Sequence, residues 1–176
     1  MSERQDLQGR HIVLGLSGGV ACFKSAQLAR ELIRAGATVQ VVMTEAAQQF
    51  ITPVTMQALT GRPVVSSQWD ARAPANMAHI DLSRQADAIL VAPASADFIA
   101  QLAQGRAAEL LALLCLARPV ERCGLLLAPA MNREMWAHPA TLAHLPPAAP
   151  PYARSQEPRA GDQRVVGCRA GRTLEP

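Results

Sequence analysis

An amide side chain stands just beyond a buried-strand pattern in the second half of the chain. The run 124–128 (GLLLA) is apolar throughout, which predicts a strand covered on both faces. Asn132 lies in the turn that follows, within the segment PAMNREMW. Its amide offers N–H donors and a carbonyl acceptor, so it either binds a ligand at this strand end or satisfies its own turn.

A turn of small residues follows the first apolar strand. Residues 11–16 (HIVLGL) predict a strand, and Ser17, Gly18 and Gly19 lead into a helix whose free backbone N–H groups suit a phosphate. A dinucleotide fingerprint would need glycine at 15, 17 and 20, but Ser17 and Val20 fill two of these places. The pattern therefore favours a mononucleotide, with a plain strand-to-helix turn as the alternative.

Two later strand ends repeat this arrangement of small and hydroxyl side chains. Thr44 follows the strand 38–43 (TVQVVM), where it either contacts a ligand or caps a short helix to about residue 51. Pro93 is expected to end the strand 88–92, and the small residues 94–96 (ASA) would let a flat ring approach the backbone. Asp97 either faces the same ligand or only caps the next helix.

The order of these elements predicts an α/β fold. Strand patterns alternate with helices expected from residue 21 to Gly36, over 53–59 and over 97–116, and no hairpin signal occurs. We expect a doubly wound, Rossmann-like (flavodoxin-like) parallel sheet with helices on both faces, in a single domain. Such sheets bind ligands beyond the carboxyl ends of their strands, where the side chains named above would gather.

Composition limits the class of protein. With 49% hydrophobic and 18% charged residues, the chain is expected to fold around one core. The net charge of +3 is spread over single arginines and only 3% of residues are aromatic, so we expect no nucleic-acid partner. No apolar run approaches the ~20 residues of a membrane span, and the amino terminus is polar, so we expect no membrane association and a cytoplasmic location.

The cysteines and the chain ends complete the picture. The four cysteines form no CxxC pair and have no histidine at zinc spacing, so no metal site or disulfide is expected, and three of them are expected in the core. We expect a polar tail at 1–9, a ligand-binding domain at 10–145, and a proline-rich loop and flap with the C-terminal tail at 146–176. Residues 165–166 hint at a last short strand.

Five segments together carry a family resemblance. They are GLSGGVACFK, VMTEAA, AHIDL, APASADFIAQLAQG and PAMNREMW, spread over about residues 10–141. In this order and spacing they resemble the flavin-dependent cysteine decarboxylases, and within them the phosphopantothenoylcysteine decarboxylases of coenzyme A synthesis. The resemblance implies that residues 10–145 form an FMN-binding decarboxylase domain.

The resemblance also implies roles for individual residues. His79 would be the base in oxidation of the substrate thiol, a role that suits an imidazole at physiological pH. Asn132 would bind the substrate carboxylate without a positive charge that keeps carbon dioxide from leaving, and Met131 would lie beside it. The alternatives are a histidine satisfied in the core and an asparagine satisfied in its turn. The implied cofactor-binding residues are Ser17, Gly18, Gly19, Val20, Thr44, Glu45, Ser95, Ala96, Asp97 and Ala130.

Cys168 would complete the set as proton donor in the reductive half of the reaction. In the family this cysteine lies in a segment similar to Ala-Cys-Gly-x-x-Gly-x-Gly-Arg-Met. Here Arg169 follows the cysteine, the spacing to the next arginine is shorter, and Thr173 replaces methionine. The alternative is a thiol without a catalytic role.

The implied reaction converts 4'-phosphopantothenoylcysteine to 4'-phosphopantetheine through thiol oxidation, loss of carbon dioxide and re-reduction. The family builds its FMN site between subunits, so we expect a homo-oligomer, a trimer or a dodecamer. A phosphopantothenate-cysteine ligase domain, covalently joined or separate, is an expected partner. Two other functions stay open: oxidative decarboxylation of a peptide's C-terminal cysteine, and a non-catalytic FMN-binding or regulatory subunit.

Overall fold

The sheet of this protein has four parallel strands and one antiparallel strand at its edge. A computed structural model describes residues 6–69, 77–144 and 166–168. The strands follow the order β2-β1-β3-β4-β5, with β5 antiparallel to β4. Their bounds are β1 His11–Leu16, β2 Thr38–Met43, β3 Ala88–Ala94, β4 Gly124–Pro129 and β5 Val166–Cys168. The doubly wound parallel sheet expected from the sequence is confirmed, and the antiparallel β5 is an addition.

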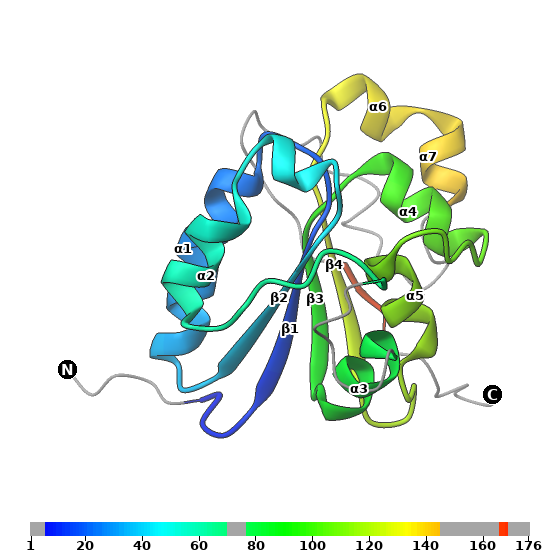
Figure 1. Ribbon diagram of the computed structural model, residues 1–176. Coiled ribbons are helices and arrows are strands. Elements are labelled where there is room, and N and C mark those ends of the chain that lie inside the picture. Colours follow the sequence, from blue (N-terminus) through cyan, green and yellow to red (C-terminus); the bar gives the residue numbers. More distant parts are fainter. Residues whose placement is uncertain (1–5, 70–76, 145–165, 169–176) are drawn as a thin grey trace.

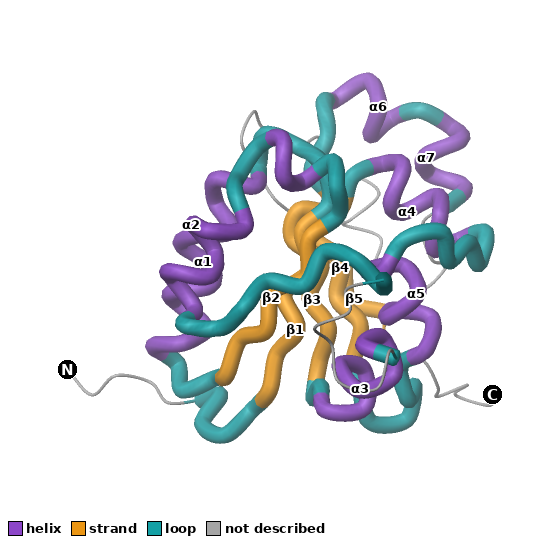
Figure 2. The backbone as a smooth tube through the Cα atoms, in the orientation of Figure 1, coloured by secondary structure: helices purple, strands orange, loops and turns teal. Residues whose placement is uncertain are grey.

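Helices cover both faces of this sheet, as expected. In Figures 1 and 2, α1 and α2 lie on one side of the strands and α3, α4 and α5 on the other. The helices are α1 Cys22–Arg34, α2 Pro53–Thr60, α3 Ala78–Gln85, α4 Ala96–Ala103, α5 Leu110–Ala117, α6 Arg133–Ala137 and α7 Pro139–Ala143, with a 3-10 turn at Ala47–Gln49. No helix within residues 6–69 or 77–144 is long and apolar enough to span a bilayer.

Two buried clusters explain why the strand sequences are continuously apolar. Val13 and Ile89 pack with the residues of α4 and α5, whereas Leu14 and Val41 pack with those of α1 and α2. Successive strand residues point to opposite faces, so both sets of side chains are buried. Gly15 is a point of close approach, because a Cβ there would lie 2.5 Å from Leu111 Cδ1 of α5.

The amino ends of three strands meet at Asp87. Its carboxylate accepts hydrogen bonds from the His11 N–H at 2.8 Å and from Arg10 Nη1 at 3.0 Å, while its carbonyl accepts from the Gly124 N–H at 3.3 Å. The bond from His11 and then that from Arg10 hold the pKa of the Asp87 carboxyl below its ordinary value. The Asp87 carboxylate therefore has a structural role at the amino ends of the strands. The carboxyl ends of the strands stay available for ligands.

Two boundaries differ from those expected. The single helix expected over 97–116 is wrong: α4 and α5 are separate, and Gly105 between them has φ +67°, a left-handed conformation that ends helices. The strand expected to end before Pro93 continues to Ala94. The register of its pairing with β4 shifts between Val91 and Ala94. The backbone N–H that Pro93 lacks is therefore not needed for a hydrogen bond between the two strands.

The chain's outer segments are only partly described. Residues 6–9 form a turn in which the Leu7 N–H bonds to the carbonyl of Ala35, at the end of α1. Most of the proline-rich segment and flap expected at 146–176 lies outside the described residues. The last strand, hinted at residues 165–166, is observed at Val166–Cys168.

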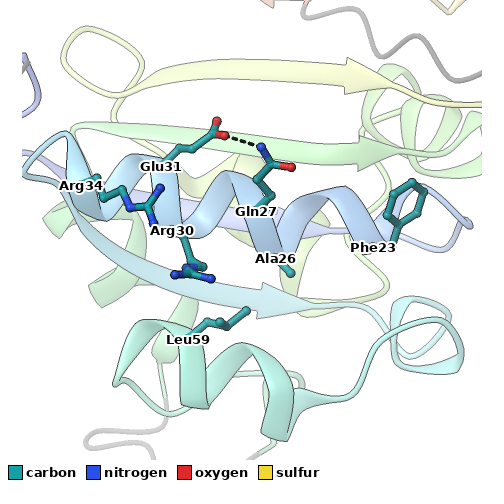
Figure 3. Close-up of a pocket in the computed structure, with 7 residues that line it drawn as sticks. All are labelled: Phe23, Ala26, Gln27, Arg30, Glu31, Arg34 and Leu59. Atoms are coloured by element: carbon teal, nitrogen blue, oxygen red, sulfur yellow. Dashed lines mark hydrogen bonds between the residues drawn. The ribbon is translucent and has the colours of Figure 1, made fainter.

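A surface groove lies between α1 and α2. It has a volume of about 500 Å³ and runs from Phe23 past Arg30 and Arg34, with Leu59 of α2 on its other side. Figure 3 shows these residues and the 2.7 Å hydrogen bond from Gln27 to Glu31 beside them. None of the residues implied in cofactor or substrate binding lines this groove.

Candidate functional site

One buried hydroxyl joins the carboxyl ends of β1 and β3. Ser17 is 2% exposed; its Oγ donates to the carbonyl of Pro93 at 2.8 Å and accepts from the Ser95 N–H at 2.7 Å. The Ser17 N–H also donates to the Pro93 carbonyl, at 3.1 Å. Because this hydroxyl is engaged in both directions, Ser17 places the adjacent turn rather than offering its side chain to a ligand.

The turn after Ser17 leaves backbone donors open. Within the described residues, the N–H groups of Gly18 and Val20 have no hydrogen-bond acceptor, and no side chain caps the amino end of α1. A Cβ on Gly18 would lie 2.6 Å from Ala46 Cβ, whereas a Cβ on Gly19 would meet nothing within 4 Å. Free N–H groups, a helix amino end and open space together are features that suit an anion.

Thr44 lies under the neighbouring turn and is 5% exposed. Its Oγ1 accepts a hydrogen bond from the Ala47 N–H at 3.1 Å, at the start of a 3-10 turn whose N-cap is Ala46; the short helix to about residue 51 expected from the sequence is therefore wrong. The hydroxyl proton takes no part in that bond. Glu45, the next residue, is exposed at the same strand end.

The small residues after β3 begin helix α4. Ser95 is its N-cap, because Ser95 Oγ accepts from the Phe98 N–H at 3.2 Å. Capping by Asp97, the alternative considered from the sequence, is therefore wrong. Asp97 lies exposed in the first turn and accepts a hydrogen bond from Gln101 Nε2 at 2.6 Å, while Ala96 is half-buried beside it. Gln101 was not among the residues predicted for this site, although its i+4 spacing from Asp97 could have indicated the pair.

Asn132 caps the short helix α6 beyond β4. Its Oδ1 accepts from the Met135 N–H at 2.8 Å, so this amide does satisfy its own turn. The side chain is exposed, and its N–H donors take no part in that bond. The buried side chain of Trp136 anchors α6 to the core, and the partly buried side chain of Met131 packs against the same cluster. The Ala130 N–H donates a hydrogen bond to the carbonyl of Ala94 at 3.1 Å. The cap thus fixes the amide while leaving its donors for a ligand.

The two remaining candidates lie elsewhere in the chain. His79 is half-buried at the start of α3, which packs against α5. Figure 1 shows α3 near the amino ends of the strands and α6 beyond their carboxyl ends. The backbone of Cys168 pairs with Leu125, near the amino end of β4. A single copy therefore groups Asn132 with the cofactor candidates but does not bring His79 to them.

The other cysteines belong to the core, as expected. Cys22, Cys115 and Cys123 are free and buried, and burial raises the pKa of the Cys115 thiol to about 12. Such thiols are not nucleophiles at neutral pH. Among the residues that the structure describes, no cluster of His, Cys, Asp and Glu has the arrangement of a metal site.

Comparison with known proteins identifies the family. The profile of the family described as Flavoprotein matches residues 1–147. This chain belongs to the flavoprotein family. A relative from Vibrio cholerae serotype O1, the coenzyme A biosynthesis bifunctional protein CoaBC, is 47% identical over 172 residues, which are 98% of this chain and 42% of the relative. The chain thus spans less than half of that protein.

Solved flavoprotein structures share the fold. The FMN-dependent cysteine decarboxylase SpaF matches with a TM-score of 0.72 at 28% identity, over 78% of each chain. A PPC decarboxylase mutant complexed with pantothenoylaminoethenethiol matches with a TM-score of 0.66 at 25% identity, over 89% of each chain.

The buried hydroxyl of Ser17 generates the first prediction. Ser17→Ala leaves the Ser95 N–H and the Pro93 carbonyl with fewer partners in a buried place, so the free energy of unfolding should fall by about 2 kcal/mol. The matched control is Ser66→Ala at an exposed site without hydrogen bonds among the described residues, and should change stability by less than about 0.5 kcal/mol. Urea unfolding measures both. Equal stability of the two variants would contradict this role of Ser17.

Proposed function

We propose that this chain is an FMN-dependent decarboxylase that converts 4'-phosphopantothenoylcysteine to 4'-phosphopantetheine in coenzyme A biosynthesis. The observation that carries the proposal is the arrangement of open backbone N–H groups beyond β1 and a fixed amide, Asn132, beyond β4, on either side of β3 in one sheet. The similarity to CoaBC and to a PPC decarboxylase supports this substrate.

The residues beyond β1 and β3 fit FMN. The open N–H groups of Gly18 and Val20 and the free space at Gly19 suit its phosphate, and half-buried Ala96 leaves backbone accessible to a flat ring. Thr44, Glu45, Ser95, Asp97 and Ala130 complete the proposed cofactor-binding set. FMN, when bound, takes up two electrons from the cysteinyl thiol and returns them after carbon dioxide has left.

Each remaining side chain has one proposed task. The Asn132 N–H donors bind the substrate carboxylate beside Met131. Because the amide is neutral, it does not stabilise the carboxylate charge against the loss of carbon dioxide, which leaves the electron pair on the substrate. The imidazole of His79 accepts the thiol proton. The thiol of Cys168 donates a proton when electrons return to the substrate.

Two copies of the chain are needed for this chemistry. The helices that carry His79 and Asn132 lie near opposite ends of the strands, so one copy cannot place both on a single cysteinyl group. We therefore infer a homo-oligomer with the site between subunits, a trimer or a dodecamer as the family resemblance implies. We further infer a cytoplasmic location, and a phosphopantothenate-cysteine ligase, fused or separate, as partner.

A peptide substrate is the second candidate. The departures around Cys168, with Arg169 after the cysteine, favour a reaction that ends at the enethiol. The similarity to the cysteine decarboxylase SpaF is compatible with it. A non-catalytic FMN-binding subunit is the weaker alternative, because the Asn132 amide is held with free donors.

Substitution at Gly19 tests the cofactor site. The space in front of Gly19 admits a side chain, so Gly19→Asp should fold, yet its carboxylate would repel a phosphate. We expect a yellow wild-type protein with about one FMN per chain, and an FMN dissociation constant raised at least about tenfold in Gly19→Asp. Gly19→Asn, of the same size but neutral, should bind several-fold more tightly than Gly19→Asp. Flavin fluorescence titration measures all three, and equal affinities would refute a phosphate at this turn.

The mass of the product tests the reaction. Wild-type protein should turn 4'-phosphopantothenoylcysteine into 4'-phosphopantetheine, whereas Cys168→Ser should release carbon dioxide but accumulate the enethiol, about two mass units lighter, because a hydroxyl is a much weaker acid than a thiol. Mass spectrometry of the small molecules decides. Release of enethiol by both proteins would favour the peptide-type reaction. Saturated product from both proteins at equal rates would exclude a catalytic role for Cys168. The absence of any turnover would refute the proposed activity.

Mixed assemblies test the site between subunits. His79→Asn and Asn132→Ala should each be inactive alone. Co-expressed as two tagged chains, they should recover activity, because about a quarter of the sites in a randomly mixed ring combine both intact residues. The control is a chain that carries both substitutions. When two tagged copies of this double variant are co-expressed in the same way, they should stay inactive. No recovery in isolated mixed assemblies would place both residues in one copy.

A further inference from the structure

A second buried hydroxyl ties helix α1 to the end of β3. Ser25 lies near the start of α1 and is 1% exposed. Its Oγ donates a hydrogen bond to the carbonyl of Ala92 at 2.6 Å, although the two residues are 67 positions apart in sequence. A serine inside a helix lowers helix propensity relative to alanine, and it often bonds to a carbonyl of its own helix. The hydroxyl of Ser25 instead joins two elements of the fold.

The carbonyl that Ser25 binds lies where the pairing of β3 is interrupted. Ala92 and Pro93 have no pairing partner in β1 or β4, because the register with β1 ends one residue earlier and the register with β4 shifts around both residues. Two serine hydroxyls bind these adjacent carbonyls, Ser25 at Ala92 and Ser17 at Pro93. Since a buried carbonyl without a partner is costly, both hydroxyls hold this strand end in place.

The start of α1 and the turn before it are thus attached to β3 at two points. Ser17 holds the turn and Ser25 holds the helix, while the thiol of Cys22, the first residue of α1, donates to the Ser17 carbonyl at 3.3 Å. Gly18 and Val20 lie between the two serines in sequence, and their N–H groups have no acceptor among the described residues. The positions of these donors therefore depend on where the amino end of α1 lies against β3.

We propose that Ser25 is a positioning residue for the phosphate of FMN. The inference rests on the proposed cofactor, and Ser25 acts through α1 because its own hydroxyl is buried and engaged. By attaching α1 to the Ala92 carbonyl, this hydroxyl keeps the N–H groups of Gly18 and Val20 in fixed positions. Hydrogen bonds to charged groups are strong, but they weaken steeply when the donor is displaced or misaligned. A small shift of α1 reduces phosphate binding and leaves contacts to the flavin ring in place.

The test compares FMN with riboflavin, which has the same ring and lacks the phosphate. We call the dissociation constant of riboflavin divided by that of FMN the phosphate preference. In Ser25→Ala the Ala92 carbonyl loses its donor and α1 loses its attachment. We expect FMN binding weaker by on the order of tenfold and an unchanged riboflavin affinity, so the phosphate preference should fall by the same factor. Flavin fluorescence titration at one pH and salt concentration measures both constants.

Ser83→Ala is the matched control. Ser83 is 0% exposed, and its Oγ donates to the carbonyls of Ile80 at 3.0 Å and Ala117 at 3.4 Å, between α3 and α5. Loss of this hydroxyl should lower the urea midpoint of unfolding, as Ser25→Ala does, because each variant leaves a buried carbonyl with fewer partners. The phosphate preference of Ser83→Ala should equal that of wild type. A merely structural role of Ser25 would make the two variants alike in this ratio.

Ser25→Cys tests rescue by a conservative change. A thiol is a weaker donor than a hydroxyl and forms a longer hydrogen bond, so this variant should have a phosphate preference between those of wild type and Ser25→Ala. If Ser25→Ala does not fold, Ser25→Cys decides, because a phosphate preference equal to that of wild type would then overturn the role of Ser25. Failure of both variants to fold would leave stability as the only measurable role of this hydroxyl and would also overturn the proposal.

The outcomes separate this inference from the proposed function. An unchanged phosphate preference in folded Ser25→Ala overturns the positioning role and leaves the cofactor in place. A wild-type protein that binds no FMN overturns the inference together with the proposed function. A phosphate preference that falls in Ser25→Ala, recovers in part in Ser25→Cys and is unchanged in Ser83→Ala supports the inference.

Discussion

The Ser17 hydroxyl holds together the carboxyl ends of β1 and β3, and the surrounding site is arranged around it. Since it donates to the Pro93 carbonyl and accepts from the Ser95 N–H, it fixes both the turn before α1 and the residue that caps α4. The turn can then leave the N–H groups of Gly18 and Val20 without acceptors among the described residues. In a flexible pair of strand ends those donors could find partners within the protein, and they would no longer be available to the phosphate that we propose.

The site combines positive backbone dipoles with negative side chains. The turn at Gly18 and Gly19 presents N–H groups, whereas Asp97 and Glu109 lie at the starts of α4 and α5. A ligand with an anionic end and a donor-rich end would fit this separation of charge, with the anionic end toward α1. This polarity, rather than the volume of a closed cavity, indicates how a cofactor would be oriented.

Much of the fold could be predicted because its signals are local. The apolar runs at 11–16 and 38–43 gave the bounds of β1 and β2, and Pro53 and Gly61 marked the ends of α2. The break at Gly105 was missed because the residues on both sides of it favour helix, and glycine alone rarely decides such a break. The course of β3 past Pro93 depends on its ladder with β4, which no local pattern reports. For the site, small residues at strand ends indicated where ligands bind, but the partners of Ser17 are 76 and 78 residues away in sequence. The cap at Ser95 likewise required the folded geometry, whereas the i+4 spacing of Asp97 and Gln101 is a local signal of their contact.

The contact between Gly15 and Leu111 has a consequence for how this sequence can change. A methyl group at position 15 would occupy the place of a Leu111 methyl, so the two positions are limited by their combined volume. A larger residue in the strand is compatible with the present distance between β1 and α5 only if the helix residue becomes smaller at the same time. Among homologous chains, these two positions are therefore expected to covary in size although they lie on different elements.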